Sequence, residues 1–327
     1  MGIKIIEYRQ MIQILVIFMI VQFAGLFLMT LALNGSGYTQ ISPASSNSGG
    51  IFSNTLSIVL YAGYIVLVSA LLILLFKYFK GGTIFKIFEA VVIFFSTFIV
   101  VGLVVGLFSF SNIVIVSNYL NVDVLISFIC AAALVYAKNR WGILRNFAAM
   151  VASVGVGIAL GLSFPFYYAL LFMVIIAVYD FIAVFITKHM LSLANVVQQN
   201  NLAFMVGVSE YMSVPKQTLT KEQSQLSASF KANPNVSKLM GSKMVSMPAN
   251  VALGTGDLSI PLMVGISAMV SSSASVNFTL GVLIAIGSTI GLVITMFILR
   301  KYKRALPAIP PLLLGVLIGI GVYLLLL

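Results

Sequence analysis

Long apolar runs separated by short polar segments dominate the sequence. A bilayer core about 30 Å thick requires roughly 20 apolar residues in a helix, and most of these runs approach that length. Helices satisfy their own backbone hydrogen bonds in lipid, whereas a membrane barrel would need alternating strands rather than continuous apolar runs. We therefore expect an all-α polytopic membrane protein with nine transmembrane helices. The predicted spans are residues 11–33, 53–76, 86–109, 120–137, 143–163, 165–187, 246–271, 277–299 and 307–327.

The basic residues mark one side of the predicted bundle. All 18 Lys and Arg residues lie at the N-terminus or in the loops after the second, fourth, sixth and eighth spans. Because such residues collect in cytoplasmic loops, we expect a cytoplasmic N-terminus and an extracytoplasmic C-terminus. An even number of spans would break the alternation, so the charge pattern supports nine spans in a multi-pass protein of the cell membrane.

Composition narrows the classes of function. Hydrophobic residues make up 61% of the chain and charged residues 8%, against about 25% charged in a soluble domain. The net charge of +11 does not indicate nucleic-acid binding, because the basic residues stand singly or in small groups at the ends of apolar runs. One Cys and one His argue against a tetrahedral metal site, and no cofactor motif is present.

One long polar segment divides the predicted helices into two groups. Residues 1–187 contain the first six helices, residues 188–245 form a cytoplasmic loop, and residues 246–327 contain the last three. The stretch 221–238 is too polar to build a hydrophobic core, so we expect the loop to be flexible.

Two acidic residues lie deep within apolar runs. Of the seven acidic residues, Asp180 and Asp257 are far from the ends of their spans, whereas Glu89 and Asp123 lie close enough to helix ends to reach the interface. A charge at the bilayer centre costs at least about 2.5–3.5 kcal/mol, so such residues face a partner or a wet cavity and mark functional sites. No basic residue lies deep within a predicted span to pair with them.

The two aspartates lie at matching depths. Asp180 follows Pro165 by 15 residues, and Asp257 precedes Ser271 by 14 residues. At 1.5 Å per residue both are about 21–22 Å from the outer face. Two neighbouring carboxyls tend to share one proton. One can then act as a base toward water and the other as an acid toward a carbonyl oxygen, as in aspartic proteases.

Glycine and proline residues, which alter backbone conformation, lie next to Asp257 and at the start of the last predicted span. Gly254 and Gly256 remove side-chain bulk before Asp257 and permit close backbone approach, although such glycines also serve simply to pack membrane helices. Residues 307–311 read Pro-Ala-Ile-Pro-Pro, which interrupts helical hydrogen bonding. Backbone groups freed there can pair with an extended peptide, and a plain proline-rich helix start is the alternative.

Three motifs together resemble those of the presenilin and signal peptide peptidase family, the Gly-x-Gly-Asp intramembrane aspartyl proteases. The matching residues are Tyr179-Asp180, Gly254-Thr255-Gly256-Asp257 and Pro307-Ala308-Ile309-Pro310. They are similar to the family's Tyr-Asp pair on the sixth helix, its Gly-x-Gly-Asp on the seventh, and the Pro-Ala-Leu that opens the ninth. The likeness covers nearly the whole chain, which looks most like an archaeal presenilin homologue. Thr255 and Ile309 each stand where the family pattern has Leu.

The resemblance implies an aspartic endopeptidase that cuts within transmembrane segments of other membrane proteins. Asp180 and Asp257 would activate water without a metal or organic cofactor, and the other motif residues would hold the unwound substrate extended. The expected partners are transmembrane substrates and the bilayer, not nucleic acid. We expect no requirement for accessory subunits, and the oligomeric state stays open.

Two other classes of membrane protein compete with this interpretation. A transporter or ion channel could use the aspartates as proton or cation sites in broken helices, which explains the acids and the glycines but not the three motifs together. A rhomboid-type serine protease needs a histidine within the membrane. The only histidine, His189, lies just beyond the sixth predicted span.

Overall fold

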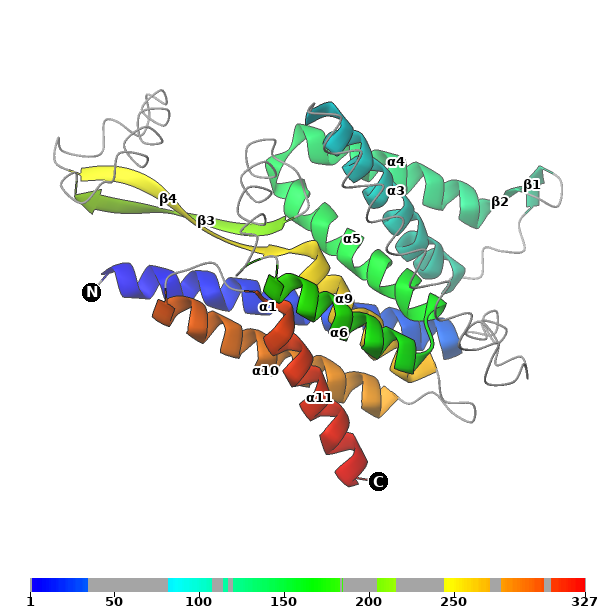
Figure 1. The fold of residues 1–327 in the computed structure, drawn as a ribbon. Helices are drawn as coiled ribbons and strands as arrows, with labels where there is room; N and C mark the ends of the chain where they lie inside the picture. Colours follow the sequence, from blue (N-terminus) through cyan, green and yellow to red (C-terminus); the bar gives the residue numbers. More distant parts are fainter. Residues whose placement is uncertain are drawn as a thin grey trace. The chain divides into compact units, whose positions relative to one another are not determined.

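The structure, a computed structural model, describes residues 2–34, 82–107, 114–116, 120–182, 184, 205–215, 244–270, 278–302 and 307–326. Eight helices lie within these ranges (Figure 1): α1 (Gly2–Asn34), α3 (Gly82–Leu107), α4 (Val122–Arg140), α5 (Gly142–Ser163), α6 (Phe166–Ile182), α9 (Thr255–Val270), α10 (Phe278–Tyr302) and α11 (Ile309–Leu326). Two small sheets accompany them, one of β1 (Val114–Val116) and β2 (Leu120–Asn121), the other of β3 (Met205–Pro215) and β4 (Met244–Gly254). The predicted span 53–76 and the polar stretch 221–238 lie outside the described residues.

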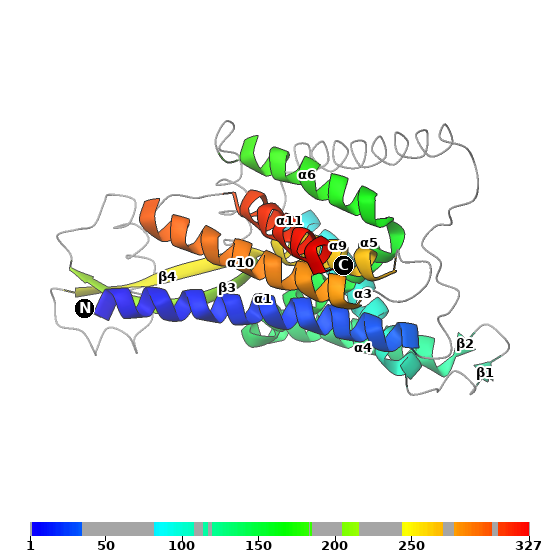
Figure 2. The same cartoon turned by 90° about the horizontal axis from the view of Figure 1, so that it is seen from below.

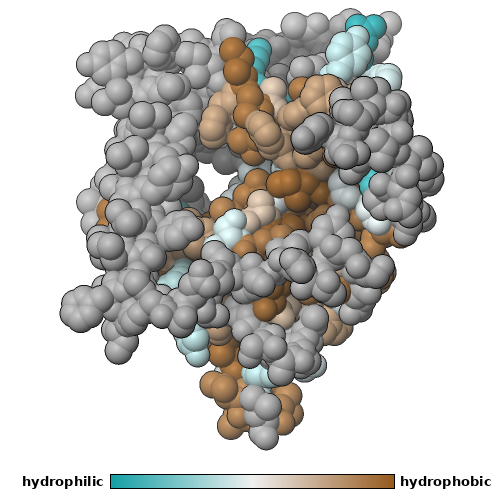
Figure 3. All heavy atoms as spheres, turned by 90° about the vertical axis from the view of Figure 1, so that its right-hand side faces the viewer, coloured by the Kyte–Doolittle hydropathy of each residue, from teal (hydrophilic) through white to brown (hydrophobic). Residues whose placement is uncertain are grey.

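Each of the eight helices coincides with one predicted span. Within the described part of the chain, five helices are long and apolar enough to cross a bilayer, and α6 and α9 are apolar but shorter. The five are Arg9–Leu33, Lys86–Leu107, Leu144–Ser163, Phe278–Leu299 and Ile309–Leu326. On the face shown in Figure 3 the coloured residues are mainly hydrophobic, as a lipid-facing surface requires.

The seventh predicted span is wrong over its first part. Residues up to Gly254 belong to β4, and the helix begins only at Thr255. Gly254 and Gly256 are poor helix formers and Pro248 has no backbone N–H, so this apolar segment favours extended structure. The structure is predominantly helical, as expected, and the two small sheets are additions that the sequence analysis did not predict; β3 lies within the 188–245 segment.

Helix α9 is the most enclosed element of the bundle, with every residue from Leu258 to Met269 buried. A Cβ added to Gly157 of α5 would lie 2.8 Å from the side chain of Leu262, and one added to Gly161 would lie 2.8 Å from Ile266. The two helices therefore run in the same direction, and glycines on α5 let large α9 side chains pack against its backbone.

Helices α10 and α11 cross in backbone contact and run antiparallel (Figures 1 and 2). A Cβ added to Gly315 would overlap the backbone of Gly287, and one added to Gly291 would overlap that of Pro311. Small residues permit this approach, which holds α11 firmly at its N-terminal half.

A buried ion pair joins α3 to α4. Nζ of Lys138 lies 2.6 Å from Oε1 of Glu89, and the two side chains are only 4% and 5% exposed. The sequence places Glu89 close enough to a helix end to reach the interface, and the structure adds a basic partner, Lys138, that the sequence analysis did not predict. A buried charge is tolerated when a close opposite charge offsets its lost hydration, and Lys138 provides that charge.

Candidate active site

Asp180 lies near the end of α6, with its carboxyl at the start of α11. The residue is buried, with 3% of its surface exposed. The backbone N–H of Ile309 donates to Oδ2 of Asp180 at 3.2 Å, and the N–H of Ala308 donates to the same carboxyl. The first amides of a helix lack partners within it, and their partial positive charge favours an anion. Asp180 therefore ties α6 to the first turn of α11.

Asp257 lies in the first turn of α9, where β4 passes directly into the helix (Figure 1). Gly254 ends the strand and Thr255 begins the helix, so Asp257 is the third helical residue. The backbone N–H of Gly254 donates to its carboxyl. This is the arrangement of a capping box, in which an acidic third residue reaches back to the amide before the helix. The helix start and the orientation of the carboxyl therefore depend on each other.

The carboxyls of Asp180 and Asp257 are close enough to interact electrostatically. Helix α6 packs against both α9 and α11, which brings the two aspartates and the proline motif together. Each carboxyl has its own amide donors, one set from α11 and one from Gly254. Two carboxyls placed in this way can share a proton and activate a water molecule that lies between them. Among the described residues, no three His, Cys, Asp or Glu side chains form a metal-binding group.

The proline motif meets the site through its backbone. The backbone N–H groups of Ala308 and Ile309 donate to the carboxyl of Asp180. Pro307 is buried and Pro310 is half-buried.

The remaining predicted residues differ in their exposure. The side chain of Tyr179 is 61% exposed whereas Asp180 beside it is buried, so the two lie on different faces of α6. Thr255 is half-buried, and the hydroxyl of Ser153 lies 3.4 Å from its carbonyl oxygen. Gly256 is exposed, and a Cβ added there would meet open space.

Sequence reasoning missed Gln22, a polar residue of the site's surroundings. Its Nε2 donates to the carbonyl of Leu258, the residue after Asp257, at 2.9 Å. The available signal was a single amide in the middle of the first apolar run. A neutral amide costs far less in lipid than a charge does, so this signal is weak.

The two glycines before Asp257 predict different results on substitution. A Cβ on Gly254 would lie 3.2 Å from Oδ2 of Asp257, so Gly254→Ala should displace that carboxyl and lower kcat about tenfold. Gly256→Ala meets open space, so it should leave Tm unchanged and instead raise KM by crowding the substrate. Both constants and Tm can be measured on the purified variants. A normal kcat in Gly254→Ala would contradict this assignment.

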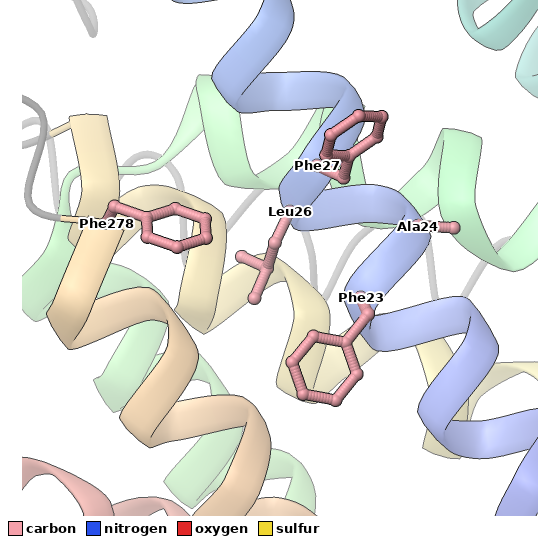
Figure 4. Close-up of a pocket in the computed structure, with 5 residues that line it drawn as sticks. All are labelled: Phe23, Ala24, Leu26, Phe27 and Phe278. Carbon is pink, nitrogen blue, oxygen red and sulfur yellow. The ribbon is translucent and has the colours of Figure 1, made fainter.

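A pocket of about 380 Å³ lies apart from the aspartates, between α1 and α10 (Figure 4). It is lined by Phe23, Ala24, Leu26, Phe27 and Phe278, all apolar. Phe278 points toward Leu26 across the pocket. With no polar group in its lining, this pocket offers no catalytic chemistry.

Comparison with known proteins identifies the family. The family model for signal-peptide peptidase, presenilin aspartyl protease matches residues 15–326. A solved structure of a presenilin family intramembrane aspartate protease in space group C222 is similar with a TM-score of 0.59 and 16% identity, covering 97% of this chain and 99% of that one. Another, in space group P2, gives a TM-score of 0.52 and 18% identity, covering 97% of each chain.

No curated protein sequence matches the chain. The two solved structures share its fold, and at their low identity they establish nothing more. The family match is independent of them and spans nearly all of the residues, including the three motifs. The chain belongs to the signal-peptide peptidase and presenilin family of aspartyl proteases.

Proposed function

We propose that Asp180 and Asp257 are the catalytic pair with which this intramembrane aspartyl protease hydrolyses peptide bonds in the transmembrane segments of other proteins. The observation that carries this is the approach of two carboxyls from α6 and α9 within the membrane-embedded bundle. Membership of the family supplies the reaction class, and the geometry supports the assignment of these two residues.

The mechanism follows from two carboxyls that hold one proton between them. The ionised carboxyl takes a proton from a water while the protonated one donates to the carbonyl oxygen of the scissile bond. The water oxygen bonds to the carbonyl carbon and gives a tetrahedral diol. When the diol collapses, the C–N bond breaks, the leaving nitrogen receives a proton from the protonated carboxyl, and a diol hydroxyl returns a proton to the ionised carboxyl.

The substrate must be extended at the point of cleavage, because a helical carbonyl is already hydrogen-bonded and shielded. We propose that the residues before Gly254 pair with it by strand addition, and that Pro307 to Pro310 form the other wall. The existence of β4 and its end at Gly254 support this arrangement, since a two-stranded sheet leaves each strand one unpaired edge.

We also propose the nine-span topology with a cytoplasmic N-terminus, in which odd spans run outward. Helix directions support it. A Cβ added to Gly281 would lie 2.6 Å from Met269, whereas one added to Gly265 would lie 3.8 Å from Ile284, so α10 runs antiparallel to α9. Since α11 runs antiparallel to α10 and α5 runs parallel to α9, these directions match spans five, seven, eight and nine. We expect the chain to act without accessory subunits.

The test is cleavage of a single-span substrate by the purified chain. We expect products cut within the transmembrane segment, identified by mass spectrometry. A peptide mimic with a hydroxyl in place of the scissile carbonyl should inhibit with an affinity at least about 100-fold above that of the substrate, because it resembles the diol.

The same preparation in vesicles distinguishes the protease from a transporter or channel. Ion or proton flux without cleavage would contradict the proposal. A mimic that binds no better than the substrate would contradict the placement of the diol between the carboxyls.

A further inference from the structure

Gln22 is a buried amide in the middle of α1 that the proposed mechanism does not use. It is 1% exposed, and its Nε2 donates to the carbonyl of Leu258 at 2.9 Å. A buried amide in apolar surroundings costs free energy unless it is hydrogen-bonded, and in membranes such side chains link helices. Because Leu258 directly follows Asp257, this bond connects α1 to the turn that carries the aspartate.

The first turn of α9 lacks part of its own backbone bonding. Pro261 lies within α9 and has no N–H, so the carbonyl of Asp257 lacks the helical bond it would receive from four residues later. The bond from Gln22 reaches the next carbonyl along the chain, that of Leu258. It therefore supports the helix where the proline weakens it.

The packing of α1 against α9 brings the side-chain amide of Gln22 to the backbone of α9. Gly25 lies three residues after Gln22, on the same face of α1. A Cβ there would lie 2.5 Å from the side chain of Leu262, so the glycine lets the two helices come close. The contacts advance together, from Gln22 at Leu258 to Gly25 at Leu262, so α1 and α9 run in the same direction.

Ser153 of α5 is the competing candidate for this role. Its hydroxyl lies 3.4 Å from the carbonyl of Thr255, but only 2.8 Å from the carbonyl of Ala149 in its own helix. A hydroxyl has one hydrogen, and the shorter bond takes it. Gln22 therefore makes the firmer of these two links to the start of α9 from another helix.

We propose that Gln22 is a positioning residue, which holds the first turn of α9 so that Asp257 keeps its orientation toward Asp180. The inference rests on the proposed catalytic pair. Gln22 is buried and acts through the backbone of Leu258. Its loss should therefore slow the chemical step more than it weakens substrate binding.

Two substitutions and one control test this role. Gln22→Leu keeps the size of the side chain and removes the donor. Gln22→Glu donates while its carboxyl is protonated and loses the donor when it ionises. Thr30→Val is the control, because the Thr30 hydroxyl bonds only one turn back, to Leu26 of α1 itself, at 2.8 Å. For each variant, kcat and KM per folded protein are measured on a single-span substrate, together with Tm.

We expect Gln22→Leu to lower kcat about tenfold with KM within about twofold of native, since a displacement of 1 Å at a reacting group can cost about 100-fold. The activity of Gln22→Glu divided by that of the native chain should fall as pH rises from about 5 to 9, because only the protonated carboxyl donates. Taking the ratio at each pH cancels the titration of the aspartates. Thr30→Val should match the native chain.

A kcat for Gln22→Leu within twofold of native would overturn the inference. If that variant does not fold, the ratio for Gln22→Glu decides alone, and a ratio independent of pH overturns it. A separate variant, Asp257→Asn, tests the proposed function. If Asp257→Asn retains activity the catalytic pair is wrong, whereas an inactive Asp257→Asn beside a normal Gln22→Leu removes only the positioning role.

Discussion

Replacement of Asp257 by Asn should abolish cleavage and leave the protein folded. The amide is nearly the same size as the carboxyl, and its oxygen can still accept the hydrogen bond from Gly254 that accompanies the start of α9. It can neither remove a proton from water nor share one with Asp180. General acid–base catalysis contributes up to about 10⁴-fold, and the pair loses both of its roles at once, so we expect a loss of at least about 10³–10⁴-fold. Asp180→Asn should lose activity to a similar extent and should also remain folded.

The control for this prediction is the variant Asp123→Asn. Asp123 also lies in the first turn of a helix, α4, and its buried Oδ1 has no hydrogen-bond partner among the residues that the structure describes, so neutralising it removes no bond to them that this oxygen makes. Cleavage of a single-span substrate and Tm should both stay near native. Activity retained by either Asp180→Asn or Asp257→Asn would refute the catalytic pair, whatever the control does.

The largest loss of stability should follow from Gly315→Val. The new side chain would overlap the carbonyl of Gly287, which belongs to the backbone of α10 and cannot move aside as a side chain can. Overpacking of this kind costs about 3 kcal/mol or more. The entropy of unfolding of a 327-residue chain is about 0.7 kcal/mol/K, so this cost lowers Tm by roughly 4 °C or more, measured in detergent. Activity should fall as well, because α11 carries the amide of Ile309 that binds Asp180.

Gly321→Val provides the matched control on the same helix. A Cβ at Gly321 meets no atom within 4 Å, so its Tm should stay within about 2 °C of native. Helix propensity changes in the same way at both positions, so the difference between the two variants isolates the contact with α10. An equal fall in Tm at both sites would show that the contact does not matter.

The two aspartates can be recognised in the sequence as candidate functional residues. A charged side chain in lipid costs so much free energy that it is rarely found there without a functional role. Their depth along two helices and the motifs beside them predicted both carboxyls as catalytic and Ile309 as part of the substrate-binding motif, and these roles stay predictions. The same apolar signal misled at residues 246–254. Apolarity predicts burial and says little about whether a short segment is strand or helix. In that segment the glycines and the proline favour the extended structure of β4. Its pairing with β3 depends on residues that are distant in the chain.

Contacts between helices were beyond sequence reasoning for a different reason. Gln22 and Leu258 are 236 residues apart, and nothing in either apolar run specifies which faces meet. Glu89 and Lys138 each lie near the end of a predicted span, where sequence assigns them separately to the interface. Only the packing of α3 against α4 brings them to 2.6 Å and buries both.

The Glu89–Lys138 pair constrains how the protein enters the bilayer. An unpaired charge on a helix partitions into lipid at a penalty that reaches about 2.5–3.5 kcal/mol at the bilayer centre and is reduced where the side chain reaches the interface, and α3 alone would carry Glu89 without its counter-charge. Once α4 is present, the ammonium neutralises the carboxylate and the two helices can leave the insertion machinery as a hairpin. During synthesis α3 is therefore expected to wait at the translocon until the last turn of α4 has been made.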